Sequence, residues 1–265
     1  MSVKSLVAGA PTGRNRPLLI DDADYSTAVI RQGASIPWTD TTLTAGHFGQ
    51  VTGLLDPDAL WIDVRRMHTA HIGARPELAK AMGARSRTGY PLRTLLADGP
   101  LLAATIELLE TVSKTARRQL ILHLPSPASW LVSAHQVAGT PLDGVDADRA
   151  DSASMYMAEW LGRLGTLPVA LVLLDGRDAP LPEAEPESPA SYTALVNVAS
   201  HFDWSLGTWD ADGMHTATGD PAIGVIAPEF WTAGTADIPE AEVLVTTIPS
   251  AAPPEFVLDQ LAKLN

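Results

Sequence analysis

Long apolar runs that lack polar alternation dominate the middle of this chain. The two clearest are Gln119–Leu124 and Pro168–Asp175, which are rich in Leu, Val and Ile and are bounded by proline or charge. Such runs are typical of strands that are covered on both faces. Two helical segments lie between them, and this strand–helix–strand order predicts a parallel sheet.

The same patterns predict the elements on either side of this stretch. Further strands are predicted at Asp58–Val64, Asp203–Trp209, Ala222–Ala227 and Glu242–Ile248, and the first strand at either Arg16–Ile20 or Thr27–Ile30. Helical spacing of apolar residues predicts helices at Thr42–Leu55, Leu92–Ala116, Ala128–Val137, Asp146–Gly165, 188–201 and Pro254–Leu264. Residues 1–16 are expected to be a flexible lead-in, and the Pro/Glu-rich run 180–189 a solvated acidic loop.

These elements predict a single α/β domain over residues 1–265. Seven or eight strands without an internal repeat or a domain break suit a (β/α)8 barrel, which takes roughly 250 residues. The last connections are too short for full helices, so we expect a TIM-like barrel that is distorted or incomplete. An open, doubly wound parallel sheet is the alternative.

Composition excludes several functional classes. The formal net charge of −13 argues against general affinity for nucleic acid or anionic membranes. The chain has no cysteine, which excludes disulfides, a thiol nucleophile and zinc sites built on thiolates. No apolar run approaches the roughly 20 residues of a membrane span. The apolar run near the amino end is too short for a secretory signal, so the chain is expected to be cytoplasmic.

Charge is distributed unevenly along the chain. Residues 65–93 contain one anion, Glu77, and the cations Arg65, Arg66, Arg75, Lys80, Arg85, Arg87 and Arg93. These cations form either a solvated face or a cap over a binding site. In the second reading, Arg65, Arg66 and Arg87 bind a carboxylate or phosphate by forked hydrogen bonds. That reading predicts a small anionic ligand.

Polar side chains stand where the predicted strands end, and in either architecture these ends meet at the ligand-binding face. They are Ser35, Asp63, His123, Asp175, Asp210, Glu229 and Thr247. A ring of acids with one imidazole supports general acid–base chemistry or the binding of a divalent cation.

We predict catalytic roles for Asp63, His123 and Asp175. Ser35, Asp210 and Glu229 are predicted to bind substrate, together with the three cap arginines. Each residue also has a structural alternative. An aspartate after a strand often caps the next helix, and a histidine between leucines is often a hydrogen-bonded core residue.

Other motifs give weaker signals. His68 and His71 stand three residues apart, but no third ligand lies at a known spacing, so a solvated loop is expected and no metal site is predicted. There is no Walker A sequence and no G-x-G-x-x-G after a strand, and no cofactor is predicted. Trp130, Trp160 and Trp231 are interpreted as exposed aromatics that permit a homo-oligomeric interface.

Three segments in order, Gly33–Asp40, Leu120–Trp130 and Val169–Gly176, carry a family resemblance. Together they resemble the superfamily that joins cobalamin-independent methionine synthase with uroporphyrinogen decarboxylase. The first is similar to the Gly-Ser-Leu/Phe-Pro turn after the first barrel strand, and the second to a strand that runs into a Gly-Pro-x-Thr/Ser-Leu helix start. The third is similar to the strand that ends in an Asp-Glu-Pro motif. The resemblance covers about residues 30–180 and implies a barrel fold.

The chain departs from this superfamily where the family's chemistry is concentrated. Zinc-dependent members carry His-x-Cys on a late strand, whereas this chain has Leu206–Asp210 there and no cysteine. Gly176 and Arg177 replace the Glu and Pro of the Asp-Glu-Pro motif. Ile30–Gly33 is similar to the Arg-Gln-Ala-Gly segment of the decarboxylase branch, without its alanine and following arginine. Asp63 is the counterpart that the resemblance implies for that branch's active-site acid.

Two functional hypotheses follow. The resemblance implies a metal-independent enzyme, methyltransferase-like or decarboxylase-like, that acts on a small anionic metabolite that is carboxylated or bears a one-carbon group. Cations of segment 65–93 would bind it, and Asp63, His123 or Asp175 would move protons. The alternative is a non-catalytic barrel that has lost zinc methyltransferase chemistry and binds a ligand or a partner protein. A metal hydrolase that uses His68, His71 and nearby acids is a third, weaker reading.

Overall fold

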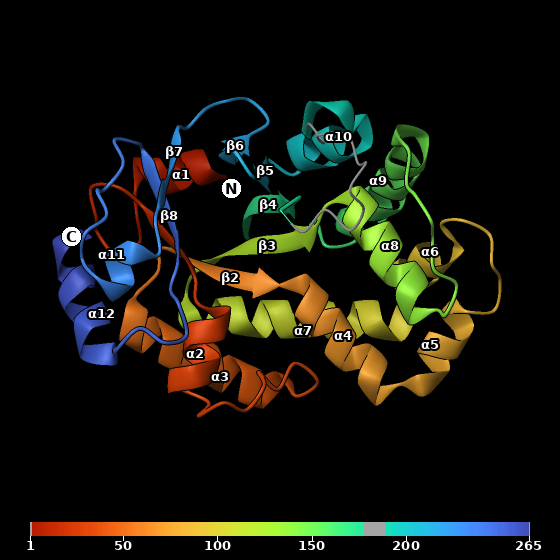
Figure 1. Cartoon of the computed structure of the whole chain (residues 1–265), viewed down its shortest axis with the longest axis horizontal. Coiled ribbons are helices and arrows are strands. Elements are labelled where there is room, and N and C mark those ends of the chain that lie inside the picture. The colour runs from red at the N-terminus through yellow and green to blue at the C-terminus, as the bar shows by residue number, and fades with distance from the viewer. Residues whose placement is uncertain (1, 178–188, 265) are drawn as a thin grey trace.

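The computed structural model describes residues 2–177 and 189–264, so almost all of the predicted acidic loop at 180–189 lies outside the described residues. Eight strands form one sheet that curves into a nearly closed barrel (Figure 1). The strands are β1 (Leu18–Asp21), β2 (Ala59–Asp63), β3 (Gln119–Pro125), β4 (Val169–Asp175), β5 (Ser205–Asp210), β6 (Gly213–Thr216), β7 (Ile223–Ile226) and β8 (Val243–Thr247).

Strand pairing defines the architecture. The strands follow the order β6–β5–β4–β3–β2–β1–β8–β7. Every paired neighbour runs parallel except β5 and β6, which form an antiparallel hairpin. Within the described part of the chain no ladder joins β6 to β7, so the barrel is open at this seam. The structure therefore confirms a distorted TIM-like barrel in preference to an open doubly wound sheet.

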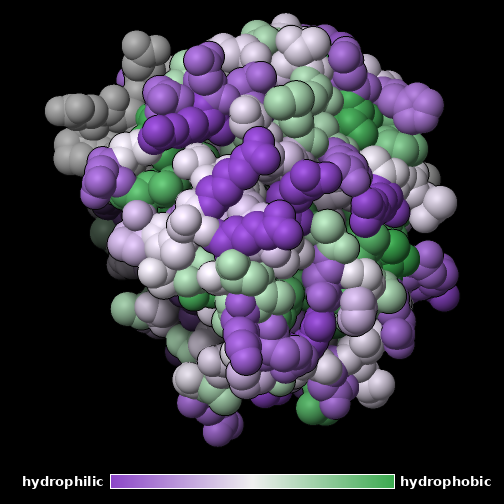
Figure 2. Space-filling model, turned by 90° about the vertical axis from the view of Figure 1, so that its right-hand side faces the viewer, coloured by the Kyte–Doolittle hydropathy of each residue, from purple (hydrophilic) through white to green (hydrophobic). Residues whose placement is uncertain are grey.

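Helices surround the barrel and extend past one end of it. They are α1 (Val3–Ala8), α2 (Ala23–Val29), α3 (Thr41–Leu55), α4 (Val64–Ala74), α5 (Pro76–Met82), α6 (Tyr90–Ala97), α7 (Gly99–Ala116), α8 (Pro127–Val137), α9 (Ala147–Gly162), α10 (Thr193–His201), α11 (Glu229–Thr232) and α12 (Pro254–Leu261), with short 3-10 turns η1 (Pro189–Ser191) and η2 (Ala262–Leu264). Helices α5, α6 and α8 lie toward the end to which β2 and β3 point (Figure 1). Figure 2 views the molecule from that side and shows a mainly hydrophilic surface with scattered apolar patches.

Alternate strand residues face the barrel interior and the surrounding helices. On β3, Ile121 packs inside the barrel with Trp61, whereas Leu120 and Leu122 pack against the helices. Both faces of the central strands are therefore apolar, which explains their uninterrupted apolar sequence. Burial of one such leucine stabilises the fold by about 2 kcal/mol.

Helix α1 corrects the expectation that residues 1–16 form a flexible lead-in. Val3 and Leu6 are fully buried in the interior cluster. The Val3 N–H donates at 3.1 Å to the hydroxyl of Ser205, the first residue of β5. The helix thus covers the amino-terminal opening of the barrel with two apolar side chains, and this burial favours its ordered position.

Two predicted elements differ in the structure. Of the candidate first strands, Arg16–Ile20 overlaps β1, whereas Thr27–Ile30 belongs to the end of α2. The long helix predicted at Leu92–Ala116 is two helices, α6 and α7, that meet at Asp98. The Asp98 carboxylate accepts the Leu101 N–H at 2.7 Å and caps α7, so a new helix begins there.

Strand β6 and three tryptophans also differ from expectation. The four residues of β6 show no apolar pattern of their own, and this strand was not predicted. Trp130, Trp160 and Trp231 are at most 3% exposed. They are core residues, because the surrounding helices need large apolar side chains to fill the space between them. The interpretation of them as exposed aromatics is therefore wrong, and a homo-oligomer stays a prediction. No helix in the described ranges is long and apolar enough to cross a membrane.

Candidate functional site at the barrel mouth

The carboxyl ends of neighbouring strands bring polar side chains to one end of the barrel, which we call the mouth. Asp63 on β2 and His123 on β3 are direct partners in their ladder. Asp175 ends β4, opposite Pro125 of β3. Because these strands run parallel, His123 and Asp175 lie at the same end of the molecule, as the predicted barrel requires.

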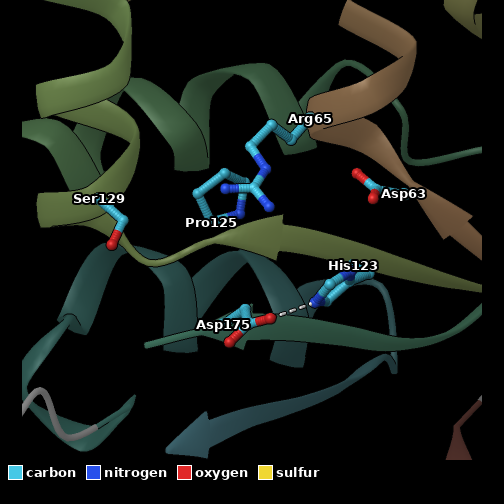
Figure 3. Close-up of a pocket in the computed structure, with 6 residues that line it drawn as sticks. All are labelled: Asp63, Arg65, His123, Pro125, Ser129 and Asp175. Carbon is cyan, nitrogen blue, oxygen red and sulfur yellow. Dashed lines mark hydrogen bonds and ion pairs between the residues drawn. The ribbon is translucent and has the colours of Figure 1, made fainter. Parts of the chain in front are cut away.

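A pocket opens at the mouth between β2, β3 and β4. It encloses about 270 Å³, part of which is open solvent, and its lining is Asp63, Arg65, His123, Pro125, Ser129 and Asp175. Figure 3 shows Arg65 reaching from the start of α4 across Pro125, while Ser129 approaches from α8. The predicted catalytic residues and one predicted cap arginine therefore share one small concave surface.

Asp175 fixes the orientation of His123. The His123 Nε2 atom lies 2.8 Å from Asp175 Oδ2 (Figure 3). A carboxylate can only accept, so in the neutral ring Nε2 carries the proton and Nδ1 carries the lone pair. No group among the described residues bonds to Nδ1 of His123. His123 itself lines the pocket, and Nδ1 is the ring nitrogen that the Asp175 contact leaves available to a ligand.

Arg177 holds Asp175 from the other side. Its Nε and backbone N–H both donate to Oδ1 at 3.0 Å, and its Nη2 donates to Oδ2 at 2.7 Å. Burial acts to raise the pKa of Asp175, but the hydrogen bonds from His123 and Arg177 outweigh it and hold the pKa far below its usual range. Asp175 therefore remains a carboxylate. It accepts a hydrogen bond from His123 Nε2, and its predicted catalytic role stays a prediction.

Asp63 serves both the pocket and the fold. Its Oδ1 accepts the Arg66 N–H at 2.9 Å and caps α4. Its Oδ2 pairs with Arg66 Nε at 3.1 Å, and Arg66 Nη1 reaches Asp24 at 2.7 Å. Arg66 is therefore engaged by two carboxylates of the protein itself. Of the two neighbouring arginines, Arg65 is the one that lines the pocket.

Sequence analysis missed Asp21, which ends β1. The alternation along β1 directs its side chain toward the interior. Among the described residues, its carboxylate accepts two long hydrogen bonds, from the Ala23 N–H at 3.4 Å and the Thr247 hydroxyl at 3.5 Å. Burial raises the pKa of Asp21, and the opposing charge of His123 does not cancel this effect. Asp21 thus differs from Asp175, because its pKa is raised and that of Asp175 is lowered.

The next residue, Asp22, was also missed. It is 3% exposed, and burial raises its pKa to about 7, although a hydrogen bond with Ser26 acts in the opposite direction. Two acids directly after the apolar residues Leu18–Ile20 are a usable signal for a strand end. The signal was not used because two different runs competed for the first strand.

Two tryptophans fill the barrel next to the pocket. Trp61 precedes Asp63 by two residues on β2 and packs with its ring centroid 5.2 Å from that of His123. Trp209 lies opposite Asp175 on β5, 5.8 Å from the Trp61 ring. The guanidinium carbon of Arg177 stacks 3.6 Å above the Trp209 ring centre. These large side chains fill the interior, so the pocket is shallow and suits a small ligand.

The remaining predicted residues do not line this pocket. Ser35 and Arg87 are exposed in loops, and Glu229 is exposed at the start of α11. Asp210 accepts the Asp212 N–H at 2.9 Å and closes the turn between β5 and β6. Thr247 ends β8 beside Asp21. Substrate contacts of Ser35, Arg87, Asp210 and Glu229 remain predictions.

The histidines expected in a solvated loop are buried instead. His68 and His71 lie on α4 and are 2% and 9% exposed. His68 packs between the rings of Trp130 and Trp160, and burial lowers its pKa to about 3. Apolar residues of α4 pack into the core and bury the two histidines with them. The expected solvated loop is therefore wrong. No cluster of three or more metal-ligating side chains occurs in residues 2–177 and 189–264.

A scan against protein-family models finds no match, and searches of curated proteins and solved structures find no match either. The barrel fold therefore rests on the structure of this chain, and membership in the methionine synthase and uroporphyrinogen decarboxylase superfamily remains a prediction. What the mouth can do must be argued from its own residues.

Proposed function

We propose that this barrel is an enzyme that acts on a small anionic, carboxylated metabolite at the mouth pocket, with His123 as the group that accepts a proton. The observation that carries the proposal is the 2.8 Å pair of His123 and Asp175, set in a pocket that Arg65 also lines. A histidine that lines a cavity and whose Nε2 is held by a permanent carboxylate is suited to general base catalysis through its second nitrogen.

Each residue has a distinct role in this proposal. Arg65 binds the substrate carboxylate, because a guanidinium offers two parallel N–H donors to a planar anion. His123 takes a proton from the substrate at Nδ1. Asp175 keeps the proton on Nε2 and stabilises the imidazolium once Nδ1 is protonated. Asp63 fixes the start of α4, and with it the position of Arg65.

The substrate class follows from charge and size. The lining includes one arginine, Arg65. Arg66 pairs with Asp63, and Arg177 pairs with Asp175. The carboxylates of the lining disfavour a ligand with several negative charges. A pocket of about 270 Å³ with open solvent accommodates a compact metabolite more readily than a tetrapyrrole. We therefore favour a small monocarboxylate, with the methyltransferase-like or decarboxylase-like chemistry that the resemblance implies.

A binding barrel without turnover is the second candidate. The observation that favours it is the degree to which the acids are engaged: Asp63 caps a helix and pairs with Arg66, and Asp175 accepts from His123 and Arg177. In this case Arg65 would bind an anion and His123 would only accept a hydrogen bond. Turnover by the wild-type protein separates the two candidates.

The test begins with a thermal-shift screen of the wild-type protein against small carboxylates, folates and porphyrins, followed by calorimetry and turnover assays with each ligand found. We expect Arg65→Met to weaken binding by about tenfold or more. Arg85→Met, which removes an exposed arginine of the same segment that has no predicted role in binding, should leave affinity unchanged. His123→Gln should retain binding and lose turnover by about 100-fold or more. Equal affinities for the Arg65 and Arg85 variants would overturn the placement of the anion.

A further inference from the structure

We infer that the β5–β6 hairpin is a positioning element for His123, which acts through the stack of Arg177 on Trp209 and through Asp175. The inference rests on the proposed function, because it explains how the protein keeps the proposed base in one orientation. It gives a role to the part of the barrel that departs most from a regular (β/α)8 pattern. Arg177 and Trp209 are positioning residues, since neither is in the lining of the pocket.

The hairpin places Trp209 beside the end of β4. Trp209 lies opposite Asp175 in the β4–β5 ladder, and its carbonyl accepts the Gly176 N–H at 2.8 Å. On its other side, Trp209 pairs with Met214 of β6. Strand β5 therefore has partners on both sides up to its last residues, which fixes the backbone of Trp209. The indole is 5% exposed.

The close approach of β6 depends on a glycine. A Cβ atom at Gly207 would lie 2.9 Å from the His215 carbonyl oxygen of the facing strand. Such a contact forces the two strands apart, so only glycine permits this hairpin at its present spacing. The hairpin, and with it the position of Trp209, is therefore specified by the sequence.

Arg177 transmits this position to Asp175. Its guanidinium carbon is 3.6 Å from the Trp209 ring centre, a favourable cation–π arrangement. The stack holds the plane of the guanidinium, whose Nε and Nη2 atoms reach the two different oxygens of Asp175. A forked contact of this kind fixes the rotation of the carboxylate. Arg177 is 36% exposed at its side chain, and the Trp209 ring covers one face of its guanidinium.

Asp175 in turn selects the tautomer of His123. With its Oδ2 held toward Nε2 at 2.8 Å, the neutral ring keeps its proton on Nε2 and offers Nδ1 to the pocket. If the carboxylate turns away, nothing among the described residues distinguishes the two ring nitrogens. Both tautomers would then be populated, and the fraction of the ring in the competent form would fall.

The experiment is ¹⁵N NMR of the histidine rings in the ligand-free full chain, with His123 assigned by comparison with His123→Gln. We expect the wild-type protein to show a single Nε2–H tautomer. Arg177→Met and Trp209→Leu should give a mixture of tautomers, and Trp209→Phe, which keeps an aromatic face, should restore the wild-type pattern. Arg163→Met removes an arginine from an exposed ion pair with Glu159 at the carboxyl end of α9 and should have no effect.

Two outcomes separate this inference from the proposed function. A single tautomer in both Arg177→Met and Trp209→Leu overturns the positioning role, whatever the protein binds. Failure of every ligand screen overturns the proposed function and leaves the tautomer result standing as a structural finding. With a substrate in hand, Arg177→Met should lower kcat by about tenfold or more and leave KM unchanged. A loss of stability alone, with kcat intact, would contradict the inference.

Discussion

On the β3–β4 side of the mouth, the Asp175 carboxylate is surrounded by hydrogen-bond donors from His123 and Arg177. On the β1 side, Asp21 is half-buried and the next residue, Asp22, is buried. No cation lies within ion-pair distance of either in the described ranges. The pKa of an aspartate therefore shifts in opposite directions on the two sides of the mouth. Asp175 remains ionised, whereas the pKa values of Asp21 and Asp22 are raised.

This difference shows that partners decide the charge of a strand-end acid more than its residue type does. A carboxylate with several donors is a fixed anion and can orient another group. A buried carboxylate with few donors binds a proton more readily and makes the folded state sensitive to pH. The mouth therefore combines a permanent anion beside His123 with two titratable acids, Asp21 and Asp22, at the end of β1.

Asp22→Asn is expected to give the largest effect and to stabilise the protein. Burial raises the pKa of Asp22 from 3.8 to about 7, so the wild-type protein loses stability as the pH rises from about 4 through about 7. The asparagine is neutral throughout, so the variant should gain up to about 4 kcal/mol over wild type above pH 7. Urea denaturation at a series of pH values measures this gain. If the free energies of unfolding of wild type and Asp22→Asn change in parallel between pH 5 and pH 8, Asp22 is not held in an unfavourable charged state.

Asp175→Ala, on the other side of the mouth, is expected to destabilise the protein. The substitution leaves the buried donor of His123 and the donors of Arg177 without their acceptor, and should cost about 3 kcal/mol at pH 7. Since the folded pKa of Asp175 is lowered, its contribution is present above about pH 4 and fades only in stronger acid.

A matched control for Asp175 is Asp146, which caps α9 and pairs with Arg149 but is exposed. Asp146→Ala should cost only about 1 kcal/mol, the usual value for an exposed cap. Chemical denaturation of both variants at pH 7 compares them. Equal losses would mean that burial and the His123 contact add nothing at Asp175.

His68→Phe gives the smallest expected effect and extends the comparison to a buried base. Both ring nitrogens of His68 lack a partner in the described part of the chain, and burial lowers its pKa to about 3. The wild-type protein should therefore lose stability as the pH falls below about 6.5, because the unfolded chain binds the proton more tightly. Phenylalanine removes the unpaired nitrogens and should stabilise the protein by about 1 kcal/mol at pH 7 and by more at pH 5. A destabilised variant would indicate that His68 has an unrecognised polar role.

Sequence patterns predicted the parts of the fold that depend on burial of continuous apolar runs. The runs at Gln119–Leu124 and Pro168–Asp175 became β3 and β4, because a barrel strand buries both faces. Helix α1 and strand β6 were missed because their positions depend on distant contacts. Val3 and Leu6 are held by the barrel interior, and Gly207 allows the hairpin.

The site could be predicted only in part for the same reason. His123, Asp175 and Asp63 were found because parallel strands end at one face, and Arg65 because segment 65–93 is basic. The partner of each could not be read from the sequence. Arg177 appeared only as a departure from a family motif, although it contacts Asp175, and Asp21 was hidden by the ambiguous first strand.

The central claim is that Nδ1 of His123 faces the ligand while Nε2 stays with Asp175. The most direct measurement is the ¹⁵N signals of both His123 nitrogens during titration with a carboxylate found by the screen. We predict that the Nδ1 signal moves as binding saturates and that the Nε2 signal changes little, because its bond to Asp175 persists. An Nδ1 signal that stays constant through saturation would contradict the account.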